Sequence, residues 1–226
     1  MVSGSQEKTR LVLITGTDAS GKSTLIDRLQ SSNGLGVKLV EPTSWSDKAR
    51  EFKLANLRTP IDEVLINQRE SLYLELHRQF ASNVKAELAQ GYGVVTTASP
   101  LVTLVAHETM RQVISLPDHQ PTETIVGNWV ETGENIPNLI VNLHAPMDVI
   151  AQRIQNRMNA GDSTEINWGF NALFYISKYQ KRLSELITAA TDNGIQCQSY
   201  DTSTTSPEVM LSYIYRKLAG AAMHGL

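Results

Sequence analysis

The sequence predicts an α/β protein, built as a three-layer αβα sandwich around a five-stranded parallel sheet. Short apolar runs alternate with longer stretches of helical periodicity, as in proteins with a mostly parallel sheet. The first apolar run ends in a glycine-containing loop that leads directly into a helix, which is the βα order of such sheets. The length of 226 residues, with 41% hydrophobic and 19% charged residues, suits one well-packed domain spanning residues 1–226.

Five apolar runs are the predicted strands, and they cover 11–14, 37–40, 94–97, 139–143 and 195–200. Predicted helices cover 22–29, 46–57, 147–158, 168–191 and 207–218. Another helix begins near Pro100, and the longest opens at Thr59 and Pro60 and ends at Gly91, since Thr can cap a helix and Pro fits its first turn. Residues 116–136 are richer in Pro, Gly, Asn and Thr, which predicts a surface excursion.

Charge and cysteine content exclude several classes of protein. Lys and Arg total 20 against 23 Asp and Glu. The net charge of −3 excludes a strongly basic surface that binds DNA by charge alone. The single cysteine, Cys197, excludes an intrachain disulfide and a cysteine-based zinc site. Residues 1–10 are polar and no apolar run approaches about 20 residues, so we expect no signal peptide, no membrane span and a cytoplasmic location.

A phosphate-binding loop is the strongest motif of the chain. Residues 16–23 match G-x-x-x-x-G-K-[ST] and lie between a predicted strand and a predicted helix. In such loops the backbone N–H groups converge on phosphate oxygens, the lysine (Lys22) bridges the β- and γ-phosphates, and the hydroxyl (Ser23) binds Mg²⁺. The predicted nucleotide site comprises Gly16, Thr17, Asp18, Ala19, Ser20, Gly21, Lys22, Ser23 and Thr24.

Asp18 is unusual, because a carboxylate inside a phosphate-binding loop repels phosphate. Its presence there therefore indicates a functional role. It could orient an acceptor hydroxyl or a Mg²⁺-bound water. The alternative is a solvated loop residue that Lys22 compensates.

Residues 13–24, with the acidic Asp18, resemble the phosphate loop of the thymidylate kinase family. Glu41-Pro42-Thr43 with Arg50 downstream resembles that family's E-P-x segment and the arginine that follows it. The segment 137–143 with Asp148 and Arg153 resembles its fourth strand and the helix before the lid, and 195–201 with 207–209 resembles its last strand and helix. The resemblance covers nearly the whole chain except 116–136.

The resemblance implies a P-loop kinase fold and ATP-dependent phosphoryl transfer to a pyrimidine deoxynucleotide, with Mg²⁺, usually in a homodimer. It implies that Lys22 and Ser23 hold phosphates and metal, and that Asp18 meets the sugar hydroxyl of the acceptor. It also implies that Arg153 lies against the adenine and that Arg157 begins a lid over residues 157–167.

The acceptor half departs from the family's pattern. The family ends its third strand with Asp-Arg, where this chain has Thr97 and Ala98, and its lid motif D-R-x-E reads Asp-Ser-Thr-Glu at 162–165. Because an arginine offers a bidentate phosphate contact that alanine cannot replace, other residues must serve the acceptor. The candidates for acceptor binding are Arg50, Arg69, Arg78, Thr97 and His107.

Two of these choices remain open at the sequence level. The alignment favours Arg78 and helix geometry favours Arg69, because 69, 72 and 76 share a face. His107 could donate to a base edge, although a lone histidine in a helix is more often packed.

The substrate also remains open. One acceptor is dTMP; the other is the hydroxymethyl group of 5-hydroxymethyl-deoxyuridine, free or within DNA, as in a subgroup of kinases acting on 5-hydroxymethyluracil. An alcohol needs a general base, which Glu41 or Asp18 could supply. The alternative from another class is a nucleotide-binding regulatory protein that has lost catalysis.

Overall fold

The computed structural model describes residues 11–31, 37–40, 51, 62–117, 121–132, 136–161 and 172–222. Within these residues the strands are β1 (Leu11–Gly16), β2 (Val37–Leu39), β3 (Gly93–Thr96), β4 (Leu139–His144) and β5 (Gln196–Asp201). They form one sheet in the order β2-β3-β1-β4-β5, in which every neighbouring pair is parallel. The predicted five-stranded parallel sheet is therefore confirmed.

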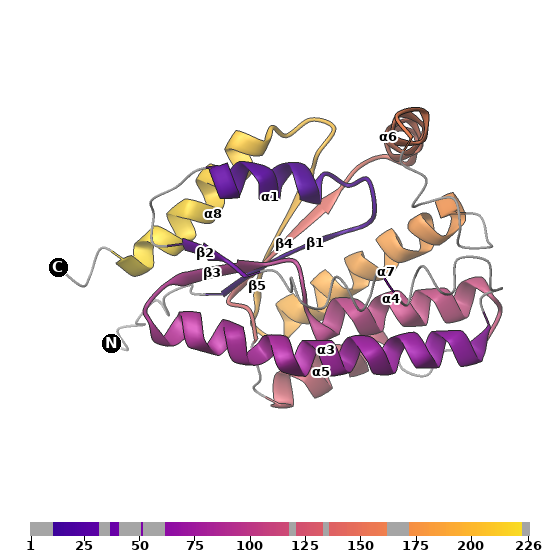
Figure 1. Cartoon of the computed structure of the whole chain (residues 1–226), viewed down its shortest axis with the longest axis horizontal. Coiled ribbons are helices and arrows are strands. Elements are labelled where there is room, and N and C mark those ends of the chain that lie inside the picture. Colours follow the sequence, from indigo (N-terminus) through magenta and orange to yellow (C-terminus); the bar gives the residue numbers. More distant parts are fainter. Residues whose placement is uncertain are drawn as a thin grey trace.

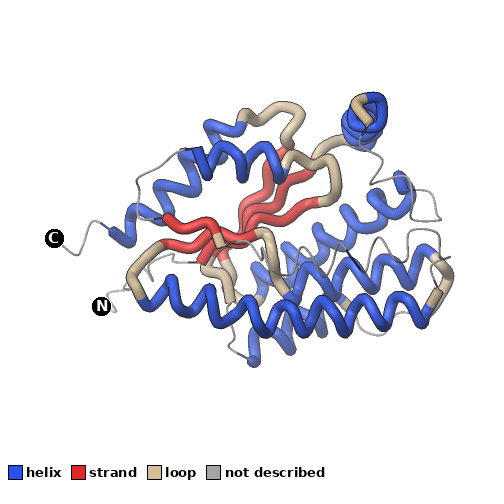
Figure 2. The backbone as a smooth tube through the Cα atoms, viewed as in Figure 1, coloured by secondary structure: helices blue, strands red, loops and turns tan. Residues whose placement is uncertain are grey.

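The helices form the two outer layers of the sandwich. They are α1 (Lys22–Ser31), α3 (Glu63–Ala89), α4 (Pro100–Val113), α5 (Thr122–Thr132), α6 (Met147–Asn159), α7 (Ala172–Asp192) and α8 (Pro207–Ala222). Figure 1 shows α1 and α8 on one side of the sheet and α3, α4, α5 and α7 on the other. In Figure 2 the strands lie between these two groups of helices.

Each face of the sheet has its own apolar core. On one face Val12, Ile14 and Val95 pack with Leu25 of α1 and Ile214 of α8. On the other face a larger cluster joins the sheet to α4, α5 and α7, and a smaller one joins it to α3. Because successive strand residues point to opposite faces, both faces of a parallel sheet must be apolar, which explains the near-continuous burial of β1.

The connection between α4 and β4 differs from the sequence-based expectation. Residues 116–136 were expected to form a surface excursion, yet 122–132 form the helix α5. Ile125, Val126 and Trp129 of this helix are buried in the large core cluster. The composition of 116–136 did not predict this short helix, because the turn residues that flank it dominate the composition of the segment.

The start of the long helix also differs. Asp62 caps α3, and its carboxylate accepts a hydrogen bond of 2.8 Å from the backbone N–H of Leu65. The predicted cap, Thr59, lies outside the described residues together with Pro60. The predicted helix start near Pro100 is confirmed: Pro100 occupies the first turn of α4, and the side chain of Ser99 caps it by accepting a hydrogen bond from the backbone N–H of Leu101.

The sheet order places the phosphate-binding loop at a ligand-binding edge. β1 lies between β3 and β4, so the connections after it run to one side first and to the other side later. In open α/β sheets ligands bind outside the carboxyl ends of the strands at such a switch point. Of the described helices, none is long and apolar enough to cross a membrane.

Candidate active site

The loop after β1 is built around two glycines with backbone conformations that other residues rarely adopt. Gly16 has φ +148° and Gly21 has φ +99°. A Cβ on Gly16 would lie 2.4 Å from the carbonyl oxygen of Leu143 and 2.5 Å from Oγ of Ser20. The loop therefore passes against β4 with no room for a side chain, and its backbone can approach phosphate closely.

Lys22 lies inside this loop. Its Nζ donates hydrogen bonds of 2.6 Å to the carbonyl oxygen of Gly16 and 2.7 Å to that of Thr17. The buried hydroxyls of Thr17 and Ser20 have no hydrogen-bond partner among the described residues. Unpartnered buried hydroxyls beside a lysine and a helix N-terminus are donors suited to phosphate oxygens, so these residues fit a nucleoside triphosphate.

We expect Gly16→Ala to destabilise the protein by about 3 kcal/mol or more, because the new Cβ meets a backbone carbonyl that cannot move aside. Gly194→Ala is the matched control: Gly194 also has positive φ, +80°, but its Cβ would meet nothing within 4 Å. That variant should cost about 1–2 kcal/mol, which is the left-handed strain alone. Urea denaturation of both variants measures the difference, and equal losses would contradict the steric account.

Arg153 joins the loop to the end of β5. Its guanidinium donates to the carbonyl oxygen of Ala19 at 3.0 Å, and to Oγ1 and the carbonyl oxygen of Thr202, both at 2.9 Å. The Thr202 hydroxyl in turn donates to the carbonyl oxygen of Ser20 at 2.8 Å. The predicted contact of Arg153 with adenine stays a prediction; the bonds seen here give this arginine a positioning role for the loop.

Removing the Thr202 hydroxyl should therefore weaken nucleotide binding without touching a nucleotide-binding side chain. We expect Thr202→Val to raise the Michaelis constant for ATP about tenfold, because Ser20 and Arg153 each lose a bond worth about 1 kcal/mol. Thr204→Val, two residues later and exposed, is the control. Unchanged ATP affinity in Thr202→Val would show that the loop holds its shape without this bridge.

A second group of polar residues lies where α3 and α7 approach the loop. Tyr175 and Tyr179 are buried on α7, and their rings stack with centroids 5.7 Å apart. Burial raises the pKa of both phenols, and the charges of Asp18 and Arg69 reach both, Asp18 raising the pKa and Arg69 lowering it. The charges of Asp18 and Arg69 therefore both act on the two tyrosines, and we call these four residues the Asp18–Arg69 cluster.

Arg69 belongs to this cluster, and its role in acceptor binding stays a prediction. Its Nη1 donates to the Sδ of Met110 at 2.9 Å, and its Cζ lies 5.0 Å from the ring centroid of Tyr73. The rival candidate, Arg78, belongs to the same helix, but its side chain is outside the part that the structure describes.

His107 lies on α4, and its ring is 1% exposed. Its Nδ1 is 3.8 Å from Oε2 of Glu70, and its ring meets the edge of Tyr73 at 6.2 Å between centroids. Burial, helped by the charge of Arg69, lowers the pKa of His107 to about 3, so the ring is neutral at physiological pH. A ring buried to this extent is consistent with a packed histidine, and its contact with a nucleobase edge stays a prediction.

A second buried histidine continues the polar seam between α3 and α4. The Nε2 of His77 and the Oγ1 of Thr103 are 2.7 Å apart. Burial lowers the pKa of His77 to about 4. Thr103 and His107 are one helical turn apart, so both contacts lie on the same face of α4.

Because of these two buried histidines, we expect the free energy of unfolding to fall in mild acid. Their pKa values are lower in the folded than in the unfolded chain, so the unfolded chain binds more protons between about pH 3 and 6.5, and stability declines as the pH falls through that window. At pH 5 each should cost about 2 kcal/mol relative to pH 7.5. Urea denaturation at both values checks this. His107→Gln should remove about half of the loss, and a parent protein equally stable at both values would contradict it.

The end of β3 divides its side chains between the two faces of the sheet. Ala98 is 8% exposed and packs with Phe80 and Val84 on the α3 side. Thr97 is half-buried directly after β3 ends at Thr96, and its role at the acceptor stays a prediction. An arginine at position 98 would enter an apolar layer and leave a charge buried there.

The remaining predicted residues are placed as follows. Arg157 lies in the last turn of α6, one turn after Arg153. Glu41, Arg50 and lid residues 162–167 lie outside the described residues.

The loop also fits Mg²⁺. Ser23 is exposed at the first turn of α1, next to Lys22, and Asp18 is exposed on the same loop. Mg²⁺ at phosphate sites is held by one or two protein oxygens together with phosphates and waters. No group of three or more His, Cys, Asp or Glu that could hold a metal occurs among the described residues, and this mode of binding needs none.

No protein-family model and no curated protein matches the chain, whereas solved structures do. Deoxyadenosine kinase from M. mycoides with bound dCTP has a TM-score of 0.62 and 14% identity, and covers 93% of this chain and 99% of that one. The same enzyme with bound dATP has a TM-score of 0.57 and 13% identity, with 91% and 98% covered. Thymidylate kinase from Candida albicans has a TM-score of 0.61 and 16% identity, with 92% and 90% covered.

The chain has the fold of these P-loop kinases. The match extends over more than nine-tenths of the chain, so it reaches well beyond the phosphate-binding loop. The hydroxymethyluracil subgroup and the acceptor are matters for proposal.

Sequence reasoning missed several residues of the site. They are Glu70, Tyr73, His77, Thr103, Met110 and Thr202. Helical spacing could have found some of them, since Tyr73 and His77 follow Arg69 at intervals of four and Thr103 precedes His107 by four. Thr202 could not be found in this way, because its bonds reach 182 residues along the chain.

Proposed function

We propose that this protein is an ATP-dependent phosphotransferase of the thymidylate kinase and deoxynucleoside kinase type. One observation carries the proposal: the loop that fits phosphates, with Lys22 at its centre, also carries Asp18, whose charge acts together with that of Arg69 on two buried tyrosines. A donor site and an acceptor site at one sheet edge are the arrangement that phosphoryl transfer requires.

In this proposal the γ-phosphoryl group moves in line from ATP to the acceptor. Lys22 and the loop N–H groups stabilise the charge on the phosphoryl oxygens, and Arg69 and Arg157 contribute positive charge nearby. Mg²⁺, held through Ser23, would neutralise phosphate charge. The lid would close over the site and exclude water.

The acceptor is a thymidine-like pyrimidine deoxynucleotide. The neutral His107, with Glu70 and Tyr73 beside it, supports recognition of an uncharged base edge. Two acceptor groups remain: the phosphate of dTMP, for which Arg69 is the cationic partner, and the hydroxymethyl group of 5-hydroxymethyl-deoxyuridine, free or in DNA. Asp18, on the phosphate-binding loop, would serve as the base for the second.

A second function is favoured by the end of β3. Ala98 is turned into the apolar layer, so the position of the family's phosphate-binding arginine offers no charge to an acceptor. A chain that binds ATP and transfers nothing would be a regulatory nucleotide-binding protein.

A screen with [γ-³²P]ATP separates these functions. The acceptors are dTMP, the other deoxynucleoside monophosphates, deoxynucleosides, and oligonucleotides that contain 5-hydroxymethyluracil. Label in a thymidine-like acceptor supports the proposal. Tight ATP binding with no labelled product would favour the regulatory protein and contradict the kinase.

A further inference from the structure

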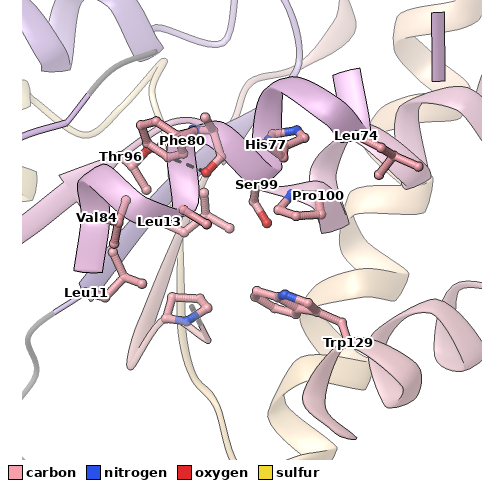
Figure 3. A pocket seen from close by; sticks show the side chains of 13 residues that line it. Leu11, Leu13, Leu74, His77, Phe80, Val84, Thr96, Ser99, Pro100 and Trp129 are labelled. Atoms are coloured by element: carbon pink, nitrogen blue, oxygen red, sulfur yellow. Dashed lines mark hydrogen bonds between the residues drawn. The ribbon is translucent and has the colours of Figure 1, made fainter. Parts of the chain in front are cut away.

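A cavity of about 220 Å³ lies on the α3 side of the sheet, and none of Asp18, Arg69, Tyr175 and Tyr179 lines it. Figure 3 shows Leu11, Leu13, Phe80 and Val84 on one side of it and Trp129 of α5 on the other.

The cavity is distinct from the phosphate-binding loop. It reaches Leu11, the first residue of β1, whereas the loop begins at Gly16, the last. No residue of 16–24 lines it, nor do Arg69 and His107. A molecule held there would not meet the phosphates of a nucleotide in the loop.

The lining excludes a charged occupant. Its described residues include no Asp, Glu, Lys or Arg, so a charged molecule would lose its hydration and gain no partner. His77 is the one titratable residue of the lining, and its lowered pKa, about 4, keeps it neutral.

The walls favour a flat ring. Phe80 and Trp129 come from different helices, and their aromatic rings can stack on or meet the edge of a planar ligand. His77, Thr96 and Ser99 are the polar residues of the lining, which suits a ligand with one hydrogen-bonding group. A dry cavity of about 150 Å³ is known to take up benzene, so this volume has room for a larger ring system.

We propose that this cavity is a second binding site, for a flat, uncharged aromatic molecule of bicyclic size that carries one hydrogen-bonding group. Because its lining atoms lack packing partners on the cavity side, an occupant gains dispersion contacts and raises the stability of the fold.

Indole is the probe, since it is a planar bicycle with one N–H group. Calorimetric titration of the whole chain should give one equivalent bound, and the melting temperature should rise with indole concentration. Ala81→Met fills the cavity from α3, because Ala81 lines it and Met is a good helix former. Ala86→Met, on an exposed position of the same helix, is the matched control.

We expect Ala81→Met to weaken indole binding at least about tenfold by removing the space, and Ala86→Met to leave it unchanged. Nuclear Overhauser contacts from indole to the Val84 methyl groups and the Trp129 ring should locate it in the parent protein, which decides the matter even if Ala81→Met fails to fold. The proposal is overturned if indole does not bind, if both variants bind it equally, or if flexible 1-hexanol binds more tightly than indole. None of these readouts depends on phosphoryl transfer.

Discussion

Lys22→Ala should reduce phosphoryl transfer by at least about a hundredfold and leave the protein folded. Removing one preorganised donor from a transition-state site typically has an effect of this size. The fold should persist because the side chain of Lys22 is half-buried and its hydrogen bonds to the carbonyl oxygens of Gly16 and Thr17 lie within its own loop. Turnover with saturating ATP and acceptor measures the first effect, and thermal unfolding measures the second.

Lys181→Ala is the matched control, because its side chain is 78% exposed on α7 and its partner Glu185 is 4.0 Å away. It should behave like the parent, since exposed pairs of this kind contribute little. A folded Lys22→Ala protein with near-normal turnover would overturn the kinase assignment.

Asp18→Asn should lower turnover by about 10²–10⁴-fold if the acceptor is an alcohol, which is the usual contribution of a positioned base. The hydroxyl proton must leave during transfer, and Asp18 is exposed on the phosphate-binding loop, where its charge reaches Tyr175 and Tyr179. A monophosphate acceptor is already ionised near neutral pH and needs no base, so with dTMP the loss should stay below about tenfold. Steady-state kinetics with 5-hydroxymethyl-deoxyuridine and with dTMP compare the two cases.

Asp27→Asn, an exposed aspartate on α1, controls for the loss of one negative charge. Glu41→Gln tests the other candidate base. If Glu41→Gln alone lowers turnover with the alcohol, the base is Glu41 and the assignment to Asp18 is wrong.

The fold could be predicted from sequence because its signals are local. Each predicted strand lies within two residues of an observed one, since buried parallel strands appear as short apolar runs. The phosphate-binding loop was predictable for the same reason: its glycines, Lys22 and Ser23 all lie within residues 16–23. The helix α5 was missed because it is short and lies among turn residues.

Many contacts of the candidate site could not be predicted, because they depend on how segments far apart in the sequence pack together. Arg69 and Met110 are 41 residues apart, and Arg153 and Ala19 are 134 apart. A residue pattern gives the face of a helix but not its partner. Ala98 illustrates this: the sequence placed it at the acceptor, and the strand turns its side chain into the apolar layer beside Phe80.

The central claim is that the loop transfers phosphate to an acceptor rather than merely holding a nucleotide. A ³¹P NMR time course of the protein with ATP, Mg²⁺ and the acceptor chosen by the screen tests it most directly. The account predicts that the γ-phosphate signal of ATP disappears while ADP and a phosphorylated acceptor grow in equal amounts. Growth of inorganic phosphate alone, or an ATP spectrum that does not change, would contradict it.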